Sequence, residues 1–451
     1  MCGLAGTYKS SVDVESMLLK IIHRGRDGQG VHKHEDTVHG HVRLSLLDLS
    51  SASKQPFILN NSTLSFNGEI WNYRDIKKKL QDDGCKFNTT GDTEVLSQFL
   101  DIYGVSRLNQ LEGMFAFVWS KGDEHWLVRD RFGEIPLYLA KTNKGYIWAS
   151  ERKAFPSGVM PVAVPPGYAF NLVKGEWFQW YKLPGTTPQQ NILDCLNRGV
   201  EQRLNADAPV CCLISGGLDS VLVLQIAKSI NKNIVAFTAK MRNDSNDLLA
   251  ARRVCSEYEI QLIEVPVSID LDSLTNAAKV IEINSKAQIE IASLCLPLAQ
   301  RIRAEGFKSC LSGEAADELF GGYGNFCIQA SKSTNTEVIS LRKSQLAKMS
   351  RGNFVRCNKA FMYGGVECRL PFMDVNLVEY AINLNLSQSP ANKKLLKSAA
   401  AKLLPKWVIS RVKDTFQGGS GVSTWTEENI ASPIKFYNNE LKKTFGYLPK
   451  D

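Results

Sequence analysis

The stretch Val210-Cys-Cys-Leu-Ile-Ser-Gly-Gly-Leu-Asp-Ser220 decides how the second half of this chain folds. Its apolar beginning is typical of a buried strand, and an apolar helical pattern resumes directly after Ser220. A small-residue loop between a strand and a helix turns backbone N–H groups and the positive end of the helix dipole toward an anion. The two glycines let a phosphate approach the backbone, and the two serines can donate to its oxygens. The stretch therefore predicts a phosphate-binding loop.

No lysine closes this loop, so its spacing differs from the G-x-x-x-x-G-K-[ST] pattern of a Walker loop. A serine–glycine turn alone is more often an ordinary strand–helix connection. The full Ser-Gly-Gly-Leu-Asp-Ser string is more specific, and it resembles the pyrophosphate-binding loop of ATP pyrophosphatases, which cleave ATP to AMP and pyrophosphate. The resemblance implies ATP contacts from Ile214, Ser215, Gly216, Gly217, Asp219 and Ser220.

The segments that follow the loop alternate between strand and helix patterns. The expected strands lie at residues 234–238, 261–267 and 308–311, and the expected helices at residues 247–258 and 271–281. Such alternation predicts a parallel sheet with helices on both faces. Ligands of these sheets bind beyond the carboxyl ends of the strands. We therefore expect Ile214 and Ala239, which end two neighbouring strands, to flank an adenine ring.

A second specific signal is Ser312-Gly313-Glu314-Ala-Ala-Asp317-Glu-Leu-Phe-Gly-Gly-Tyr323, which follows the last of these strands. Ser312 and Gly313 are expected to contact ATP. Asp317 can bind Mg²⁺ together with Asp219, because this ion prefers one or two carboxylates combined with phosphate oxygens. Glu314 remains for an acid–base or orienting role. An acidic helix start stabilised by the helix dipole would explain one carboxylate, but not three beside a Gly-Gly turn.

The composition is that of an ordinary globular protein. The 451 residues are enough for two or three domains, with 44% hydrophobic and 22% charged residues. The sequence shows no secretory signal and no apolar run long enough for a membrane span, so a cytoplasmic location is expected. The net charge of +8 is modest and gives little support to nucleic-acid binding. All six histidines lie in the first third, so acid–base chemistry in the second half must use carboxylates, lysine or tyrosine.

The chain opens with Met1-Cys2-Gly3. Once Met1 is removed, the α-amine of Cys2 lies beside its own sulfur and can accept the thiol proton. One residue then supplies both nucleophile and base. Cysteine suits this role because its thiolate is reachable near neutral pH. An incidental cysteine would be the better interpretation if nothing else supported a catalytic one.

Further motifs support the catalytic interpretation of Cys2. They are His23-Arg-Gly-Arg-Asp27, Arg43-Leu44-Ser45, Asn67-Gly68-Glu69, Gly91-Asp92-Thr93-Glu94 and Arg129-Asp-Arg-Phe-Gly133. In order and spacing they resemble the class II glutamine amidotransferase domain, an α+β N-terminal-nucleophile fold with two stacked antiparallel sheets between helices. The resemblance implies that Cys2 attacks the side-chain amide of glutamine. It also implies an oxyanion hole formed by the Asn67 side chain and the Gly68 N–H group.

An amino-acid substrate carries two charges, so a specific glutamine site needs both counter-charges. By the same resemblance, Arg43 clamps the α-carboxylate with two parallel bonds, and Glu69 and Asp92 bind the α-ammonium. For Arg43 or Asp92 taken singly, a surface ion pair would be the simpler interpretation. The residues expected to bind glutamine are Arg43, Leu44, Ser45, Asn67, Gly68, Glu69 and Asp92.

Residues 190–425 resemble the synthetase domain of the glutamine-hydrolysing asparagine synthetases, an α/β domain of the ATP-pyrophosphatase type. Lys393 takes the place of that family's catalytic lysine, and Glu314 joins it as a candidate catalytic residue. Turn residues and aromatics at 165–185 put the domain boundary near 185, which divides the chain into 2–185 and 186–451. The expected partners are small molecules (glutamine, ATP and an acid) without nucleic acid or membrane, and a homodimer is left open.

The resemblance implies a relay between two sites. ATP adenylates a carboxylate and releases pyrophosphate, Cys2 liberates ammonia from glutamine, and the ammonia crosses an internal apolar passage and displaces AMP. Aspartate is the expected acid. A different carboxylic acid stays open because Glu290 lies where the family carries an arginine of its Thr-Thr-x-Arg stretch. A glutaminase with an impaired ATP site, a β-lactam-forming synthetase and a catalytically idle protein are weaker alternatives.

Overall fold

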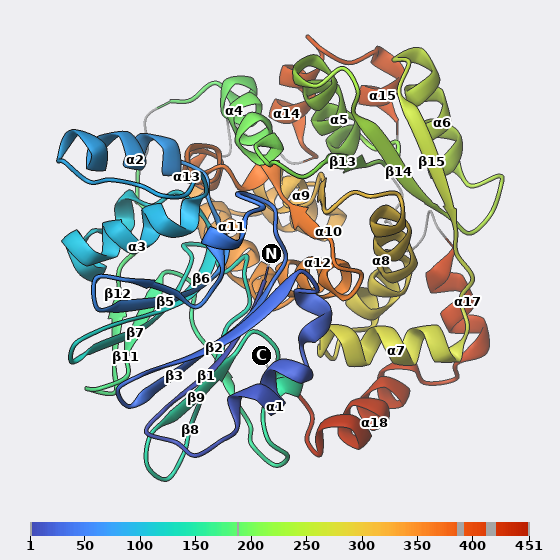
Figure 1. Ribbon diagram of the computed structural model, residues 1–451. Coiled ribbons are helices and arrows are strands. Elements are labelled where there is room, and N and C mark those ends of the chain that lie inside the picture. Colours follow the sequence, from blue (N-terminus) through green and yellow to red (C-terminus); the bar gives the residue numbers. More distant parts are fainter. Residues whose placement is uncertain (1, 187–188, 386–391, 412–420, 450–451) are drawn as a thin grey trace.

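The computed structural model describes residues 2–186, 189–385, 392–411 and 421–449. Within these ranges, two antiparallel sheets lie in the N-terminal part of the chain, and a parallel sheet lies in the C-terminal part (Figure 1). We refer to the antiparallel sheets as sheet A and sheet B and to the parallel one as sheet C.

Sheets A and B each contain six strands that pair antiparallel. The order in sheet A is β10 (Val162–Ala163), β8 (Tyr138–Lys141), β9 (Tyr146–Ala149), β1 (Gly3–Tyr8), β3 (Thr37–Arg43) and β2 (Gly28–His34). The order in sheet B is β12 (Glu176–Gln179), β11 (Tyr168–Asn171), β7 (Glu124–Arg129), β6 (Gly113–Lys121), β5 (Ser62–Ile70) and β4 (Phe57–Leu59).

Helices cover the outer faces of these two sheets. Helix α1 (Val14–Leu19) packs on β1 and β3 of sheet A, while α3 (Asp92–Tyr103) packs on β5 of sheet B and on α2 (Tyr73–Asp82). A separate apolar core, which includes Leu4, Met114 and Trp148, fills the space between the two sheets. The layers therefore run helix, sheet, sheet, helix, and the predicted N-terminal-nucleophile architecture is confirmed (Figure 1).

The C-terminal part is built on sheet C, and every strand pair in it is parallel. The order is β15 (Gln261–Pro266), β14 (Val235–Lys240), β13 (Val210–Leu213), β16 (Ser309–Leu311) and β17 (Glu367–Arg369). Helices α4 (Ile192–Leu204) and α5 (Leu218–Ile230) pack together on one side, and α8 (Lys286–Ala304) and α12 (Asn353–Tyr363) pack together on the other (Figure 1). The predicted parallel sheet is confirmed.

Two predicted boundaries shift by a few residues. Strand β14 continues to Lys240 instead of ending at residue 238, because its pairing with β15 extends to Lys240 opposite Pro266. Ala239 is therefore the second-last residue of the strand. Helix α5 begins at Leu218, three residues earlier than its apolar pattern indicates, because Gly217 has the extended backbone of an N-cap residue.

The other helices surround sheet C and connect its strands. They are α6 (Asn246–Glu257), α7 (Leu271–Ile281), α9 (Ala316–Phe320), α10 (Gly324–Ala330), α11 (Asn335–Met349), α13 (Val375–Asn383), α14 (Lys394–Ala400), α15 (Lys406–Ser410), α17 (Val422–Asn429) and α18 (Pro433–Phe445). Short 3-10 turns lie at η1 (Ile22–Arg24), η2 (Ser51–Ser53), η3 (Gly104–Gln110), η4 (Arg152–Ala154) and η5 (Pro371–Met373).

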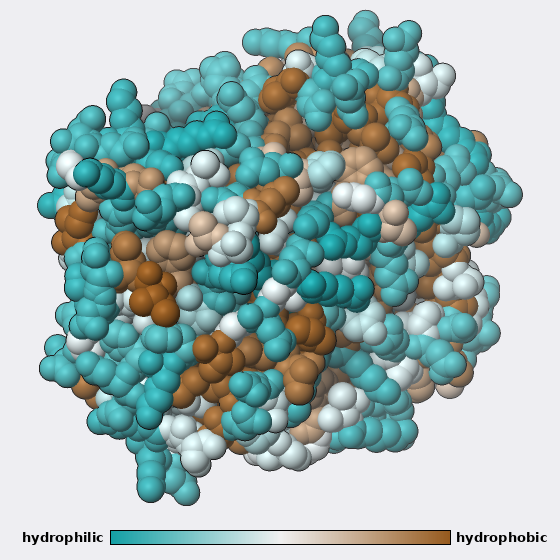
Figure 2. All heavy atoms as spheres, viewed as in Figure 1, coloured by the Kyte–Doolittle hydropathy of each residue, from teal (hydrophilic) through white to brown (hydrophobic). Residues whose placement is uncertain are grey.

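Hydrophilic side chains cover most of the face shown in Figure 2, with hydrophobic ones in smaller patches between them. Across the described residues, no helix combines the length and apolar character that crossing a membrane requires. The apolar side chains instead form several buried clusters, the largest of them around sheet C.

Candidate active sites

Cys2 lies directly before β1 and is buried, with 8% of its surface exposed. Its backbone N–H group donates a 2.8 Å hydrogen bond to Oδ1 of Asn67, and its Sγ lies 3.8 Å from the carbonyl oxygen of Leu44. Burial raises the pKa of the thiol above its ordinary value, while the nearby Arg43 opposes that shift. The pairing of β1 with β3 and the stacking of sheet A on sheet B thus bring the predicted nucleophile to residues that lie far from it in sequence.

Asn67 and Gly68 lie in β5, which pairs with β6 across sheet B. Asn67 is fully buried, and its Nδ2 atom has no hydrogen-bond partner among the described residues. A buried amide donor of this kind is costly unless a ligand uses it. Gly68 has φ of +141°, and a Cβ atom added there would lie 2.0 Å from the carbonyl oxygen of Met114. Both predicted oxyanion-hole residues therefore have unusual environments beside Cys2.

The segment from Arg43 to Ser45 leaves β3 next to the nucleophile. The guanidinium of Arg43 donates to the carbonyl oxygens of Ser50 at 2.8 Å and Asp48 at 2.5 Å. These bonds fix the orientation of Arg43. The N–H group of Ser45 donates to Asp27 at 2.9 Å, so this turn is also anchored to the motif that begins at His23.

Glu69 and Asp92 are both buried, with 4% and 5% of their surfaces exposed. Oδ2 of Asp92 accepts a 2.9 Å bond from the N–H group of Ile70, which follows Glu69 in β5. Burial raises the pKa of Asp92 to about 7 and that of Glu69 well above its ordinary value. Arg369, 3.2 Å from Glu69, opposes the shift of Glu69. Arg369 belongs to the C-terminal part and was not predicted as a site residue.

The two predicted nucleotide loops touch each other at the carboxyl ends of β13 and β16. In the first loop, the N–H group of Ser215 donates to Oγ of Ser220 at 3.2 Å, and that hydroxyl donates to the carbonyl oxygen of Gly217 at 3.1 Å. Gly313 of the second loop packs so closely that an added Cβ would lie 2.8 Å from the Ser220 nitrogen and 2.9 Å from the carbonyl carbon of Asp219. Ile214 donates from its N–H group to the carbonyl oxygen of Phe237 in β14, so Ile214 lies beside the strand that contains Ala239. The structure therefore brings together the residues predicted to bind ATP.

Lys393 lies between the two carboxylates predicted to bind a metal. Its Nζ is 2.6 Å from Asp219 Oδ2 and 2.6 Å from Asp317 Oδ1. No group of three or more His, Cys, Asp or Glu side chains in the described part of the chain forms a metal-binding cluster. The two aspartates nevertheless converge on one cation, which is the arrangement that Mg²⁺ with phosphate oxygens would need.

Glu314 is the centre of a polar group formed with α8, α9 and α12. Its carboxylate accepts bonds from Asn353 Nδ2 at 2.7 Å and Arg356 Nη2 at 2.6 Å. The same Asn353 nitrogen lies 3.0 Å from Glu318, and Asn353 Oδ1 accepts a 3.1 Å bond from Gln288. Burial and the negative charge of Glu314 raise the pKa of Glu318 to about 7. Asn353 and Gln288 carry no sequence motif of their own, so only the fold identifies them.

Glu290, the residue that leaves the choice of acid open, points elsewhere. Glu290 is buried, and its Oε1 lies 3.6 Å from Nζ of Lys286. Its carboxylate also contacts Thr426 of α17, which packs on α8. Burial raises the pKa of its carboxyl group. Lys286 forms a closer ion pair with Glu427, at 2.6 Å. Gln288, two residues before Glu290, is the part of this segment that reaches the Glu314 group.

Helix α12 contacts both candidate sites. Asn358 of α12 accepts a 2.8 Å bond from Nη2 of Arg24, whose Nε donates to the carbonyl oxygen of Cys2 at 2.9 Å. Two residues earlier in the same helix, Arg356 binds Glu314. Arg24 is fully buried and also pairs with Glu151 at 2.7 Å. In the sequence, the only indication that Arg24 belongs to the site was its position in the motif that begins at His23.

Two stacked antiparallel sheets with a cysteine at the start of the first strand, followed by a parallel sheet with a Ser-Gly-Gly loop, define a glutamine amidotransferase joined to an ATP-pyrophosphatase-type domain. The model of the glutamine amidotransferase domain matches residues 1–165. The model of the asparagine synthase family matches residues 191–351 and 337–435, and the chain belongs to this family.

Curated relatives resemble the chain over nearly its whole length. The glutamine-hydrolysing asparagine synthetase of Zea mays is 28% identical over 497 residues, which cover 99% of this chain and 83% of the relative. Asparagine synthetase B of Escherichia coli K12 is 28% identical over 466 residues and covers 94% and 83%. Among solved structures, the glutamine phosphoribosylpyrophosphate amidotransferase of B. subtilis overlaps with a TM-score of 0.37 at 15% identity, over 76% of this chain and 79% of that one.

Proposed function

We propose that this protein converts aspartate to asparagine with glutamine as the nitrogen donor and ATP as the energy source. The names of its relatives support both the donor and the product. Membership of the asparagine synthase family supports the use of ATP. We also propose that the two activities divide near residue 185, with the glutaminase in residues 2–185 and the synthetase in residues 186–451.

In the glutaminase site, the thiol of Cys2 attacks the glutamine amide and its own α-amine takes the proton. Asn67 Nδ2 and the Gly68 N–H group stabilise the resulting oxyanion. As the oxyanion collapses, the C–N bond breaks and the α-amine gives the proton to the leaving ammonia. Water then hydrolyses the thioester, which releases glutamate and restores the thiol. The observation that carries this assignment is the Asn67 amide: its oxygen holds Cys2 in place at 2.8 Å, and its buried nitrogen has no partner among the described residues. The charged ends of glutamine are then bound by Arg43 and by the pair Glu69 and Asp92, with Leu44 and Ser45 beside them.

In the synthetase site, ATP lies between the two contacting loops, with its adenine between Ile214 and Ala239. Asp219 and Asp317 would hold a magnesium ion, which would offset the negative charge of the triphosphate. Lys393 then turns from the aspartates toward the phosphates and stabilises the departing pyrophosphate. Glu314, held by Arg356 and Asn353, orients the acid or accepts a proton from the incoming ammonia.

Ammonia must travel between the two sites without reaching bulk water, where it is protonated and no longer nucleophilic. We propose that it follows the buried side chains between β17 and α12. Cys368 of β17 adjoins Glu367, whose charge acts on the Cys2 thiol. Cys357 of α12 contacts Cys368, and its Sγ lies 3.6 Å from Glu314. These two thiols therefore lie beside Glu314, and β17 joins them along the chain to Glu367.

The proposal is tested by following one nitrogen atom. Glutamine labelled with ¹⁵N in its side-chain amide is incubated with the enzyme, ATP, Mg²⁺ and aspartate, and the products are analysed by mass spectrometry. We expect labelled asparagine in amounts equal to AMP. Cys2→Ala should remove the label from asparagine but retain synthesis from ammonium chloride. If AMP forms with another acid but not with aspartate, the acceptor is wrong; if no AMP-linked product ever carries the label, the relay is wrong.

A further inference from the structure

Arg369 belongs to the last strand of the synthetase sheet, yet its side chain ends in the glutaminase part of the molecule. It is fully buried. Its Nη2 lies 3.2 Å from Glu69 Oε1, and its Nε donates to Glu367 at 2.6 Å. Its Nη1 donates to the carbonyl oxygens of Arg203 and Asn205, at 2.8 and 3.0 Å. The guanidinium is therefore fixed from several directions before any substrate binds.

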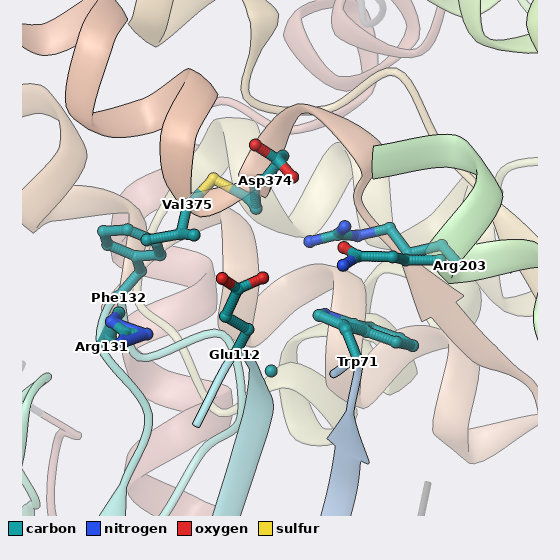
Figure 3. Close-up of a pocket in the computed structure, with 10 residues that line it drawn as sticks. Trp71, Glu112, Arg131, Phe132, Arg203, Asp374 and Val375 are labelled. Atoms are coloured by element: carbon teal, nitrogen blue, oxygen red, sulfur yellow. The ribbon is translucent and has the colours of Figure 1, made fainter. Parts of the chain in front are cut away.

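The surroundings of Arg369 also hold it against the N-terminal part. Its guanidinium lies 5.3 Å from the ring of Trp71, two residues after Glu69, and Arg203 lies 4.9 Å from the same ring. Figure 3 shows Trp71 and Arg203 lining a small pocket at this contact, together with Glu112 and Asp374. Residues of both halves line this pocket, and charged side chains of both halves face it, so the contact between the halves is polar here.

The backbone of Arg369 points to the other site. Its carbonyl oxygen accepts a 3.0 Å bond from the N–H group of Ser312, the first residue of the second nucleotide loop. Arg369 thus contacts Glu69, which is predicted to bind glutamine, through its side chain, and Ser312, which is predicted to bind ATP, through its main chain. Glu69 directly follows Gly68, so a displacement of Glu69 would also displace the backbone of the predicted oxyanion hole.

We propose that Arg369 is a positioning residue for glutamine, which holds the Glu69 carboxylate where it binds the α-ammonium group of the substrate. The glutamine pocket of the N-terminal half is then completed by the C-terminal half. A buried carboxylate in this place needs a cation to remain ionised, and a guanidinium held by fixed acceptors also sets its orientation. This inference rests on the proposed glutaminase activity.

The test compares two ligands that differ only in the α-ammonium group. Glutamine is the substrate, and glutaramate, which keeps the amide and the carboxylate but lacks the amino group, is the competitive inhibitor. For Arg369→Gln we expect the KM for glutamine to rise about tenfold, because the Glu69 carboxylate loses the buried cation 3.2 Å away. The inhibition constant of glutaramate should change less than about twofold, because the missing contact is one that this ligand never makes.

Arg342→Gln is the matched control, since Arg342 is another fully buried arginine of the synthetase half and donates to the carbonyl oxygen of Leu384. This substitution should leave the ratio of the KM for glutamine to the inhibition constant of glutaramate unchanged. Equal weakening of both ligands by Arg369→Gln, or no weakening of either, would overturn the proposal.

If Arg369→Gln does not fold, as judged by circular dichroism, Arg369→Lys and Glu69→Gln carry the test. Glu69→Gln must produce the same selective loss of glutamine affinity, and equal effects on both ligands would again overturn the proposal. A wild-type enzyme that releases no glutamate from glutamine would refute the glutaminase itself, and this inference with it. Wild-type hydrolysis with unselective variants would refute the inference alone.

Discussion

Replacing Asn67 with alanine removes two interactions that one side chain makes in the glutaminase site. Its oxygen accepts the 2.8 Å bond from the Cys2 N–H group, and its buried nitrogen has no partner among the described residues. The first interaction exists before glutamine binds, and in the proposed mechanism the second forms only when an oxyanion develops. The substitution should therefore act mainly on the chemical step.

The expected size follows from these two losses. An oxyanion-hole donor is worth about 3 kcal/mol, so kcat for glutamine hydrolysis should fall roughly 10²- to 10³-fold. The lost bond to the Cys2 backbone costs stability of about 1 kcal/mol. The KM for glutamine should change much less than kcat, because the residues proposed to bind the charged ends of the substrate, Arg43, Glu69 and Asp92, are unchanged.

The assay measures glutamate release at saturating glutamine and, in the same preparation, AMP release with ammonium chloride as the nitrogen source. Asn72→Ala serves as the control, because Asn72 is a nearby asparagine that bonds to the backbone of Gln110 and Glu112. Its kcat should stay near that of the wild type. A folded Asn67→Ala enzyme whose glutaminase kcat falls less than about threefold would refute this role of Asn67.

Three further predictions concern other residues of the two sites and the sheets. Gly68→Ala should prevent stable folding or abolish glutamine hydrolysis, since its Cβ would lie 2.0 Å from the Met114 oxygen; thermal unfolding and glutamate release check this. Lys393→Ala should stop pyrophosphate release while glutamate release persists, because it removes the cation between Asp219 and Asp317; loss of both activities would count against separate sites. Burial lowers the pKa of His41 from 6.5 to about 3, so as the pH falls the imidazole is protonated in the unfolded chain before it is protonated in the folded one. The free energy of unfolding is therefore highest above pH 6.5 and falls progressively toward pH 3. At pH 5 the loss is about 2 kcal/mol, measured by urea unfolding at pH 7 and 5, and His41→Gln should reduce the difference.

The fold of the C-terminal part could be predicted from sequence because its signals are local. The short apolar strands, the loop from Ser215 to Ser220 and the segment from Ser312 to Tyr323 each show their structure within a dozen residues. A parallel sheet then determines that the ends of β13 and β16 meet, which is why the two loops could be expected to share a ligand. The predicted partnership of Asp219 and Asp317 followed from this rule, but the lysine between them did not.

The contacts between the two halves could not be predicted in this way. Arg369 and Glu69 are 300 positions apart in sequence, and no periodic pattern relates them. The direction of the Glu290 side chain was equally unpredictable, because only the resemblance to the synthetase family indicated that its carboxylate lies near the acceptor acid. Its actual neighbours are Lys286, one helical turn earlier in α8, and Thr426, which only the packing of α17 against α8 brings to that place.

The ammonium group of Lys393 is the counterion of Asp219 and Asp317 in the predicted nucleotide site. Two aspartates in this place would repel each other if nothing neutralised them, and the tethered cation lets that region fold before a nucleotide arrives. In the proposed function, a magnesium nucleotide that bound these aspartates would displace the Lys393 ammonium from them. The released side chain would then be free to bind the phosphates.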